Sequence, residues 1–157
     1  MNNKYINFYN TLVNLTRNKI LYKNFINQDT FSDRLIIFLF HFAFFLNIFN
    51  SNNQKKVLQD IFDYIFRQIE ISIREIGYGD VSINKKMKSY INIFYSILNN
   101  INDWDSLDEN NKCKIINDYL KLDNKPLIIV NYFDNYRHSL KNNTFNSVIK
   151  GVIKHNF

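Results

Sequence analysis

Cysteine, proline and glycine are scarce in this chain of 157 residues, which has one cysteine, one proline and three glycines. A single cysteine, Cys113, excludes an internal disulfide and any zinc site built from several cysteines, and it fits a reducing compartment. No stretch has the composition of a linker, and no internal repeat is visible. We therefore expect one domain that spans residues 1–157.

Recognisable catalytic and metal-binding patterns are also missing. The three histidines, His41, His138 and His155, do not have metal-ligand spacing, and Cys113 has no histidine near it in the sequence. Most of the acidic residues are explained as helix caps or ion-pair partners. No active site is visible in the sequence, and we expect no catalytic residue, no metal and no cofactor.

Positive charge exceeds negative charge, with a formal net charge of +6. Such an excess suits RNA, an anionic membrane surface or an acidic protein partner. The same lysines are equally well explained as the solvated face of a chain whose composition favours Asn, Ile, Lys, Phe and Tyr. Charge alone therefore does not choose a partner.

The most apolar stretch is LIIFLFHFAFFLNIF, residues 35–49. It is shorter than the roughly 17 to 25 residues of a membrane span, and His41 and Asn47 interrupt it. We predict a buried central helix, with a span or re-entrant segment as the alternative. We interpret His41 as a hydrogen-bonded core residue rather than a haem or metal ligand.

Helical patterns cover most of the remaining chain. TFSD (residues 30–33), SNNQ (51–54) and SLDE (106–109) resemble capping boxes and predict three helix starts. Apolar residues recur at three-and-four spacing over 58–76 and again over 83–101, which predicts an antiparallel pair of helices. The same spacing predicts an N-terminal helical face, with the residues Tyr5, Ile6, Tyr9, Leu12, Val13 and Thr16.

The C-terminal part is predicted from weaker signals. Pro126 suits the first turn of a helix, although the β-branched residues that follow, 128–130, leave a strand possible. The last segment is predicted to be a short helix that ends near Gly151. Together the patterns indicate an all-α domain of about six to seven helices around a central apolar helix.

The segment SIREIGYGDVSINKKMK, residues 72–88, contains two of the three glycines. Gly77 follows a periodic run, where a helix often ends at positive φ, and Gly79 permits a second sharp turn. Asp80 or Ser82 is expected to cap the next helix. We predict a tight corner between two helices. A phosphate-binding loop is disfavoured, because the glycine spacing of nucleotide-binding fingerprints is missing.

Three lysines follow this corner, Lys85, Lys86 and Lys88. Cations in the first turns of a helix face the positive end of its dipole, so a nearby negative group is expected. Asp80 and Glu75 are candidates inside the protein, and a phosphate or an acidic partner is the external alternative. Arg74 is expected to pair with Glu70 one helical turn earlier and is a candidate partner of Asp80.

The corner resembles the signature of the ubiquinol-cytochrome c chaperone family, in which an Arg-Glu pair, a hydrophobic residue, Gly-x-Gly-Asp and Lys-Lys-Met follow in this order. A second segment, DTFSDR with the apolar helix after it, is similar to another family segment. FYSI stands where the family tends to have Phe-Tyr-Gly-Arg, so Ser96 and Ile97 depart from it. The matching residues are Arg74, Glu75, Gly77, Gly79, Asp80, Lys85, Lys86 and Met87; Asp29, Thr30, Arg34 and His41; and Phe94 and Tyr95.

The resemblance implies an assembly factor, and not an enzyme, that binds newly made cytochrome b and assists assembly of the ubiquinol-cytochrome c reductase complex, respiratory complex III. It also implies a small partner chaperone and association with the ribosome. The basic residues Lys85, Lys86 and Lys88 would suit ribosomal RNA or an anionic membrane surface, and no DNA is expected. The length suggests a compact bacterial member without the import extension of mitochondrial relatives, cytoplasmic or peripheral at the inner face of the cytoplasmic membrane.

Candidate site residues follow from this resemblance. Gly77 and Gly79 are expected to form a structural corner. Asp29, Arg34 and His41 form a second family segment, in which Asp29 and Arg34 are a candidate internal pair. The candidate partner-binding residues are Arg74, Glu75, Asp80, Lys85, Lys86, Lys88 and Tyr95.

Two other classes of function stay open at this stage. A basic helical domain that binds nucleic acid, or another protein-interaction domain without catalysis, would use the same charge, although no recognition-helix or zinc-finger pattern is present. A small cofactor-dependent enzyme would need a polar pocket. Steep salt dependence on naked RNA or DNA would support the first class, and a bound metal or a haem absorption band would support the second.

Overall fold

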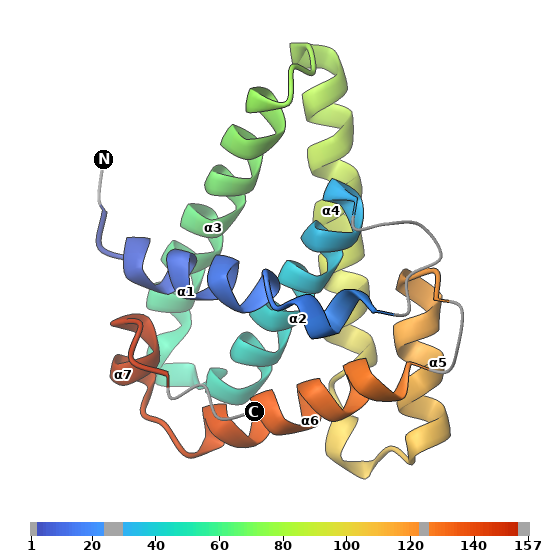
Figure 1. Ribbon diagram of the computed structural model, residues 1–157. Helices are drawn as coiled ribbons and strands as arrows, with labels where there is room; N and C mark the ends of the chain where they lie inside the picture. The colour runs from blue at the N-terminus through green and yellow to red at the C-terminus, as the bar shows by residue number, and fades with distance from the viewer. Residues whose placement is uncertain (1–2, 24–29, 123–125, 154–157) are drawn as a thin grey trace.

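The computed structural model describes residues 3–23, 30–122 and 126–153, and these residues are almost entirely helical (Figure 1). No strand occurs among them, and residues 128–130, for which a strand was the alternative, lie in a helix. The predicted all-α fold is confirmed. The seven α-helices of the described residues are α1 (Ile6–Thr16), α2 (Phe31–Phe49), α3 (Lys55–Glu75), α4 (Asp80–Asn100), α5 (Glu109–Tyr119), α6 (Leu127–Lys141) and α7 (Phe145–Ile149), and η1 (Lys19–Tyr22), η2 (Asn52–Gln54) and η3 (Trp104–Ser106) are short 3-10 helices.

Helix α2 is the centre of the fold. Every residue from 35 to 45 is buried, because α1, α4 and α6 all pack against this helix. By length and composition α2 is apolar enough to cross a membrane, but 61% of its most apolar window is buried inside the protein. A helix that is apolar on all sides is expected when neighbours surround it. The predicted buried central helix is confirmed.

The buried histidine of α2 is fully hydrogen-bonded. The Nδ1 of His41 lies 2.8 Å from the Ile37 carbonyl oxygen, and its Nε2 lies 2.5 Å from the Tyr132 hydroxyl. A carbonyl only accepts, so Nδ1 carries the proton and Nε2 accepts from Tyr132. Complete burial lowers the pKa of His41 to about 3, against the hydrogen bond to Ile37, which raises it. His41 is a neutral core residue, as predicted.

Two of the three expected helix starts differ in detail from the prediction. Thr30 does cap α2, because its hydroxyl oxygen accepts a hydrogen bond from the Asp33 amide. Ser51 makes no capping bond, and η2 precedes α3 at this point. The cap of α5 is Asp108 and not Ser106, because the Ser106 hydroxyl donates to the Asp103 carbonyl and closes a 3-10 turn.

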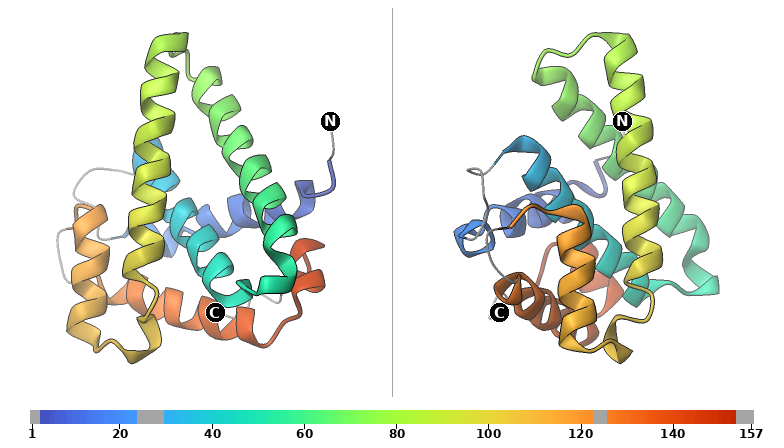
Figure 2. Two further views of the ribbon diagram at one scale, coloured as in Figure 1. Left: turned by 180° about the vertical axis from the view of Figure 1, so that it is seen from behind. Right: turned by 90° about the vertical axis from the view of Figure 1, so that its right-hand side faces the viewer.

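Helices α3 and α4 form the predicted antiparallel hairpin. They meet at one end of the molecule and diverge toward the other end (Figures 1 and 2). At the wide end the ring of Phe42 on α2 contacts both legs, at 6.5 Å from the Phe66 ring and 5.1 Å from the Phe94 ring. At the narrow end Ile76, which was expected on the buried stripe, is 50% exposed, because α3 has passed beyond the rest of the protein.

The terminal helices close the other faces of the core. Helix α6 crosses α2, and α7 packs on α1. Of the predicted face, Tyr5 directly before α1 and Leu12 and Thr16 within it are buried. The buried face of α1 also includes Phe8, Thr11 and Leu15, which the predicted face left out. The face is wider than predicted, because α1 contacts both α2 and α7. The predicted end of α7 near Gly151 is confirmed by a φ of +82° at that glycine.

Candidate functional site

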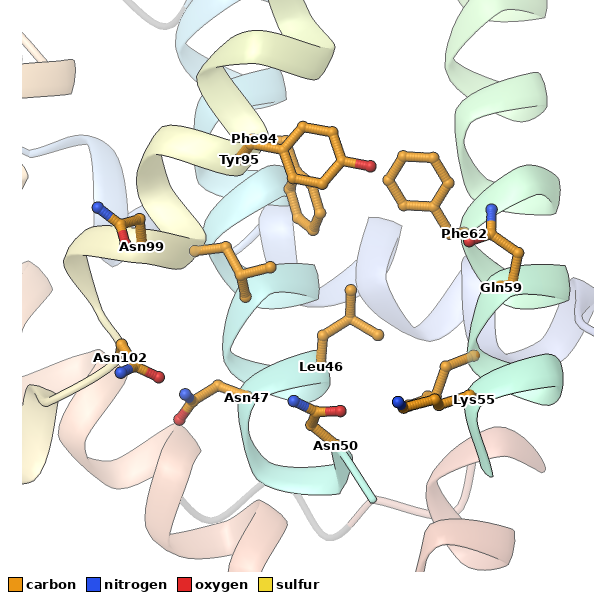
Figure 3. Close-up of a pocket in the computed structure, with 12 residues that line it drawn as sticks. Leu46, Asn47, Asn50, Lys55, Gln59, Phe62, Phe94, Tyr95, Asn99 and Asn102 are labelled. Carbon is orange, nitrogen blue, oxygen red and sulfur yellow. The ribbon is translucent and has the colours of Figure 1, made fainter. Parts of the chain in front are cut away.

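An open groove of about 660 Å³ lies at the wide end of the hairpin, where the C-terminal end of α2 faces α3 and α4 (Figure 3). Its described lining divides into two chemical kinds. The apolar and aromatic residues are Leu46, Leu58, Phe62, Phe94, Tyr95 and Leu98, and the polar residues are Asn47, Asn50, Lys55, Gln59, Asn99 and Asn102.

Aromatic rings from the two legs face each other across this groove. The Tyr95 ring of α4 stacks against the Phe62 ring of α3, with centroids 5.9 Å apart and ring planes at 26° (Figure 3). Phe94 is fully buried below them, whereas Tyr95 is 54% exposed. Aromatic residues of this kind are enriched in the core of protein interfaces. The exposed ring of Tyr95 thus offers apolar contact area at the mouth of the groove, whereas Phe94 packs beneath it.

One wall of the groove is positioned by residues from the C-terminal half of the chain. Asn47 accepts a hydrogen bond from the Arg137 guanidinium, whose Nε donates to Asp105 at 2.9 Å. Lys141 donates to the second oxygen of the same carboxylate. Burial alone would raise the pKa of Asp105, but the hydrogen bonds from Lys141 and Arg137 outweigh it and lower the pKa.

The polar part of the groove lining consists mainly of side-chain amides. Its polar side chains are five amides and one ammonium group, from Lys55, and the described lining has no carboxylate, histidine or cysteine. Amides donate and accept hydrogen bonds, so they can satisfy the backbone of a bound peptide. No group of three or more metal-binding side chains occurs within residues 3–23, 30–122 and 126–153.

The narrow end of the hairpin, residues 71–81, is called the hairpin tip below. Gly77 has a φ of +103° and its amide donates to the Arg74 carbonyl. The predicted helix end at positive φ is therefore confirmed. Gly79 does not make a turn that needs glycine, because its φ is −74° and its backbone is extended. A Cβ atom at Gly79 would meet no atom within 4 Å.

Asp80 is tied to α3 and is not a cap. The cap position of α4 is Gly79, without a side-chain bond, so the expected capping by Asp80 or Ser82 is wrong. Arg74 donates to Asp80 at 2.7 Å and to Glu70 at 3.1 Å, as predicted for both pairs. The hydrogen bond to Asp80, and next the one to Glu70, raises the pKa of Arg74. Arg74 thus joins the two helices across the corner.

The three lysines after the corner have no ion-pair partner among the described residues. Lys85 and Lys88 are exposed, and the ammonium group of Lys86 lies 4.4 Å from the centre of the Tyr78 ring. Neither Asp80, which pairs with Arg74, nor Glu75 neutralises them in the described structure. Asp80 and Glu75 therefore do not account for the three lysines. That the lysines face a phosphate or an acidic partner outside the protein stays a prediction.

The sequence-predicted candidates do not form one site. Tyr95 lies in the groove, whereas Arg74, Glu75 and Asp80 lie at the hairpin tip with the lysines directly after it; Asp80 and Tyr95 are about 22 Å apart along α4 at 1.5 Å per residue. His41 is inside the core. Of the second family segment, Arg34 and His41 are among the described residues and Asp29 is not.

Arg34, from that second segment, lines a separate cavity of about 230 Å³ between α1, α2 and α3. Asp29 lies outside the described residues, so its expected pairing with Arg34 is not tested. Asn47, Arg137 and Asp105 were missed as site residues. The one visible signal was Asn47, a polar residue at the end of the apolar run.

Comparison with known proteins places the groove and the hairpin tip in a segment that matches one protein family. No curated protein and no solved structure shows a significant match to the chain. A model of the family described as Ubiquinol-cytochrome C chaperone matches residues 23–103, which is more than half of the chain. The matched segment contains the hairpin tip, the lysines after it and all twelve lining residues of the groove. The chain belongs to the ubiquinol-cytochrome C chaperone family, which indicates a role in complex III assembly, with a protein partner and without catalysis.

Proposed function

We propose that the protein binds newly made cytochrome b during assembly of complex III and holds an apolar segment of this client in the groove between α2, α3 and α4. The observation that carries the proposal is the position of the groove. Its described lining lies entirely within the segment that matches the chaperone family, and it combines exposed aromatic surface with amide groups.

The apolar part of the groove supplies a driving force for holding a membrane protein before assembly. Cytochrome b is the haem-carrying membrane subunit, and its apolar segments gain by leaving water. Burial of one Leu or Phe side chain is worth about 1.5 to 3 kcal/mol. Two or three client side chains against Phe62, Tyr95 and Leu98 would give several kcal/mol before the costs of association. Such a margin suits binding that must later be released.

The polar rim contributes selectivity for polypeptide over lipid. Asn50, Gln59, Asn99 and Asn102 stand around the apolar floor (Figure 3). Side-chain amides can pair with backbone N–H and C=O groups at the ends or breaks of client helices, where these groups have no partner. A lipid tail offers no such groups, so it would leave the rim unpaired.

Within this proposal the protein acts in the cytoplasm, at the inner face of the cytoplasmic membrane, close to the site where cytochrome b is inserted. The ribosome and a small partner chaperone, which the family resemblance implied, stay predictions. The client contact is the part that the groove supports, and it is the part to test first.

Site-specific photocrosslinking in cells tests the client contact. A photoreactive phenylalanine analogue would replace Tyr95 or Asn99 in the groove and, as a control, Asn92, an exposed residue on the same helix outside the groove lining. Mass spectrometry would identify the attached peptides. We expect cytochrome b peptides at the two groove positions and not at Asn92. Equal recovery at all three positions, or recovery of other proteins only, would contradict the proposal.

A further inference from the structure

Exposed apolar side chains are concentrated at the hairpin tip. Among the described residues eight large apolar side chains are exposed, and four of them lie within residues 71–81. Val81 is the most exposed of all at 86%. The four are Ile71, Ile76, Tyr78 and Val81. These four residues are called the apolar patch below, because a concentration of exposed apolar side chains on a protein surface typically marks an interaction site.

This patch is not a by-product of packing against another part of the described protein. Figures 1 and 2 show that the corner between α3 and α4 projects beyond the other helices. A Cβ atom built on Gly77 or on Gly79 would meet no neighbouring atom within 4 Å, so the space around the corner is open. The tip is therefore free to contact another surface.

The charges behind the patch include three lysines without an ion-pair partner among the described residues. Arg74 holds both Glu70 and Asp80, so one of these two negative charges is compensated and one remains. Outside this group, the charges on this part of the hairpin, as far as it is described, are the ammonium groups of the three lysines and the carboxylate of Glu75. An anionic surface is the complement of the three lysines.

Along α4, the exposed apolar residue Val81 lies nearer the corner than the three lysines do. Val81, Lys85 and Lys88 have the spacing of one helical face, with the lysines about 6 to 10 Å behind Val81 along α4. The Lys86 ammonium group stands over the Tyr78 ring. Interfacial segments of proteins bury apolar side chains about 5 to 10 Å into the boundary between lipid headgroups and acyl chains, while the basic groups stay at the phosphates.

We propose that the hairpin tip docks on an anionic membrane, with Ile76, Tyr78 and Val81 in the headgroup boundary. Lys85, Lys86 and Lys88 contact the lipid phosphates. The combination of exposed apolar tips with lysines favours lipid over RNA, because phosphate contacts alone give no reason for Val81 to be exposed. This role goes beyond client binding, and its surface is about 20 Å from the groove along the helices.

Vesicle cosedimentation with the full chain tests this assignment. The lipids would be phosphatidylcholine alone and phosphatidylcholine mixed with phosphatidylglycerol. We expect binding to the mixed vesicles only, and a loss of about a hundredfold when Lys85, Lys86 and Lys88 are all changed to Gln, at about fivefold per lysine. The matched control changes Lys114, Lys121 and Lys150 to Gln, which removes the same charge elsewhere and should leave most of the binding.

Three further variants separate insertion from simple charge attraction. Val81→Ser should weaken binding to the mixed vesicles severalfold without changing the charge. Glu75→Gln should strengthen it, because one unpaired carboxylate is removed from the tip. In Tyr78→Trp the emission of the introduced indole, taken as the difference from the wild type with its buried Trp104, should shift to the blue when mixed vesicles are added. Such a shift reports entry into the headgroup boundary.

Three results would overturn the assignment. The first is that the control lysine variant loses as much vesicle binding as the tip variant. The second is that the protein does not bind the mixed vesicles at all. The third is that the tip lysines are needed for binding to a homopolymeric RNA probe but not for binding to vesicles. Failure of the groove crosslinks with intact vesicle binding would instead overturn the client proposal alone.

Discussion

The two ends of the α3–α4 hairpin are made from the same two helices but have opposite surroundings. At the wide end Phe66 and Phe94 are buried against Phe42 of α2. At the narrow end Ile76 and Val81 have apolar side chains of similar kind and are exposed. Helical periodicity therefore does not determine burial by itself. What differs is whether a third helix stands beside the pair, and only the wide end has one.

Truncation of apolar side chains should give the largest difference in unfolding free energy between the two ends. Phe42→Ala removes ring contacts to Phe8, Phe45, Phe66 and Phe94 and should cost about 3 to 5 kcal/mol of unfolding free energy. Val81→Ala at the tip should change it by no more than about 0.5 kcal/mol. Urea titrations of both variants measure this, and a comparable loss for both would mean that the tip is packed in solution.

A change of pH should act on the core through His41 of α2. The pKa of His41 is about 3 in the folded protein and ordinarily 6.5, so below pH 6.5 the unfolded chain binds a proton that the folded one does not. Folding stability therefore falls as pH falls, by about 1.4 kcal/mol per unit between pH 6.5 and 3.

His41→Gln isolates this contribution. The variant loses stability at pH 7, but it has no imidazole to titrate, so its deficit relative to the wild type should shrink by about 2 kcal/mol between pH 6.5 and pH 5. Urea titrations at the two pH values give the deficit. A deficit that does not change with pH would show that His41 takes up a proton inside the folded protein. Tyr132→Phe, which keeps the histidine, serves as the control.

The two glycines of the tip should respond differently to the same substitution. Gly77→Ala places a side chain at a φ of +103° and should cost about 1 to 2 kcal/mol. Gly79→Ala is compatible with its φ of −74° and with the open space around it. It should change stability by less than about 0.5 kcal/mol, because the lower entropy of the unfolded chain is offset by the weaker preference of Ala for the N-cap position of α4. Thermal unfolding of the two variants compares them, and equal losses would disprove the assigned backbone conformation.

Only a small effect on stability is expected in the groove, where client binding is proposed. Tyr95→Ala removes a half-exposed ring that stacks on Phe62, so unfolding free energy should change by about 1 kcal/mol or less. Capture of cytochrome b from cells that produce the variant should nevertheless fall severalfold. Asn92→Ala on the same helix is the control for both measurements. Loss of stability without loss of capture would make Tyr95 a packing residue.

Local features of the fold were predictable because they depend on residues three to six positions apart. The Thr30 cap, the Glu70–Arg74 pair, the Arg74–Asp80 link and the positive φ of Gly77 all follow from short-range geometry. The α5 cap was misplaced because Ser106 and Asp108 both fit the pattern. The 3-10 turn that uses the Ser106 hydroxyl decides between them.

The groove was not predictable in the same way, because its walls meet only after the chain has folded. Asn47 is held by Arg137, 90 positions later, and Arg137 is held in turn by Asp105. An asparagine at the end of an apolar run signals a polar contact but does not name its partner. Tyr95 was found from the family resemblance, yet its position opposite Phe62 depends on how α2 separates the two legs.

The burial of α2 also has a consequence for the time during which the protein is synthesised. Tyr132, which completes the hydrogen bonds of His41, is 91 positions further along the chain. At about 5 to 20 residues per second a ribosome needs about 5 to 18 seconds to add them. During this interval α2 is an apolar 19-residue segment without a complete cover, because α4 is made only partway through it and α6 near its end. Translation speed over the second half of the message therefore sets how long this apolar segment is exposed before the helices that bury it are present.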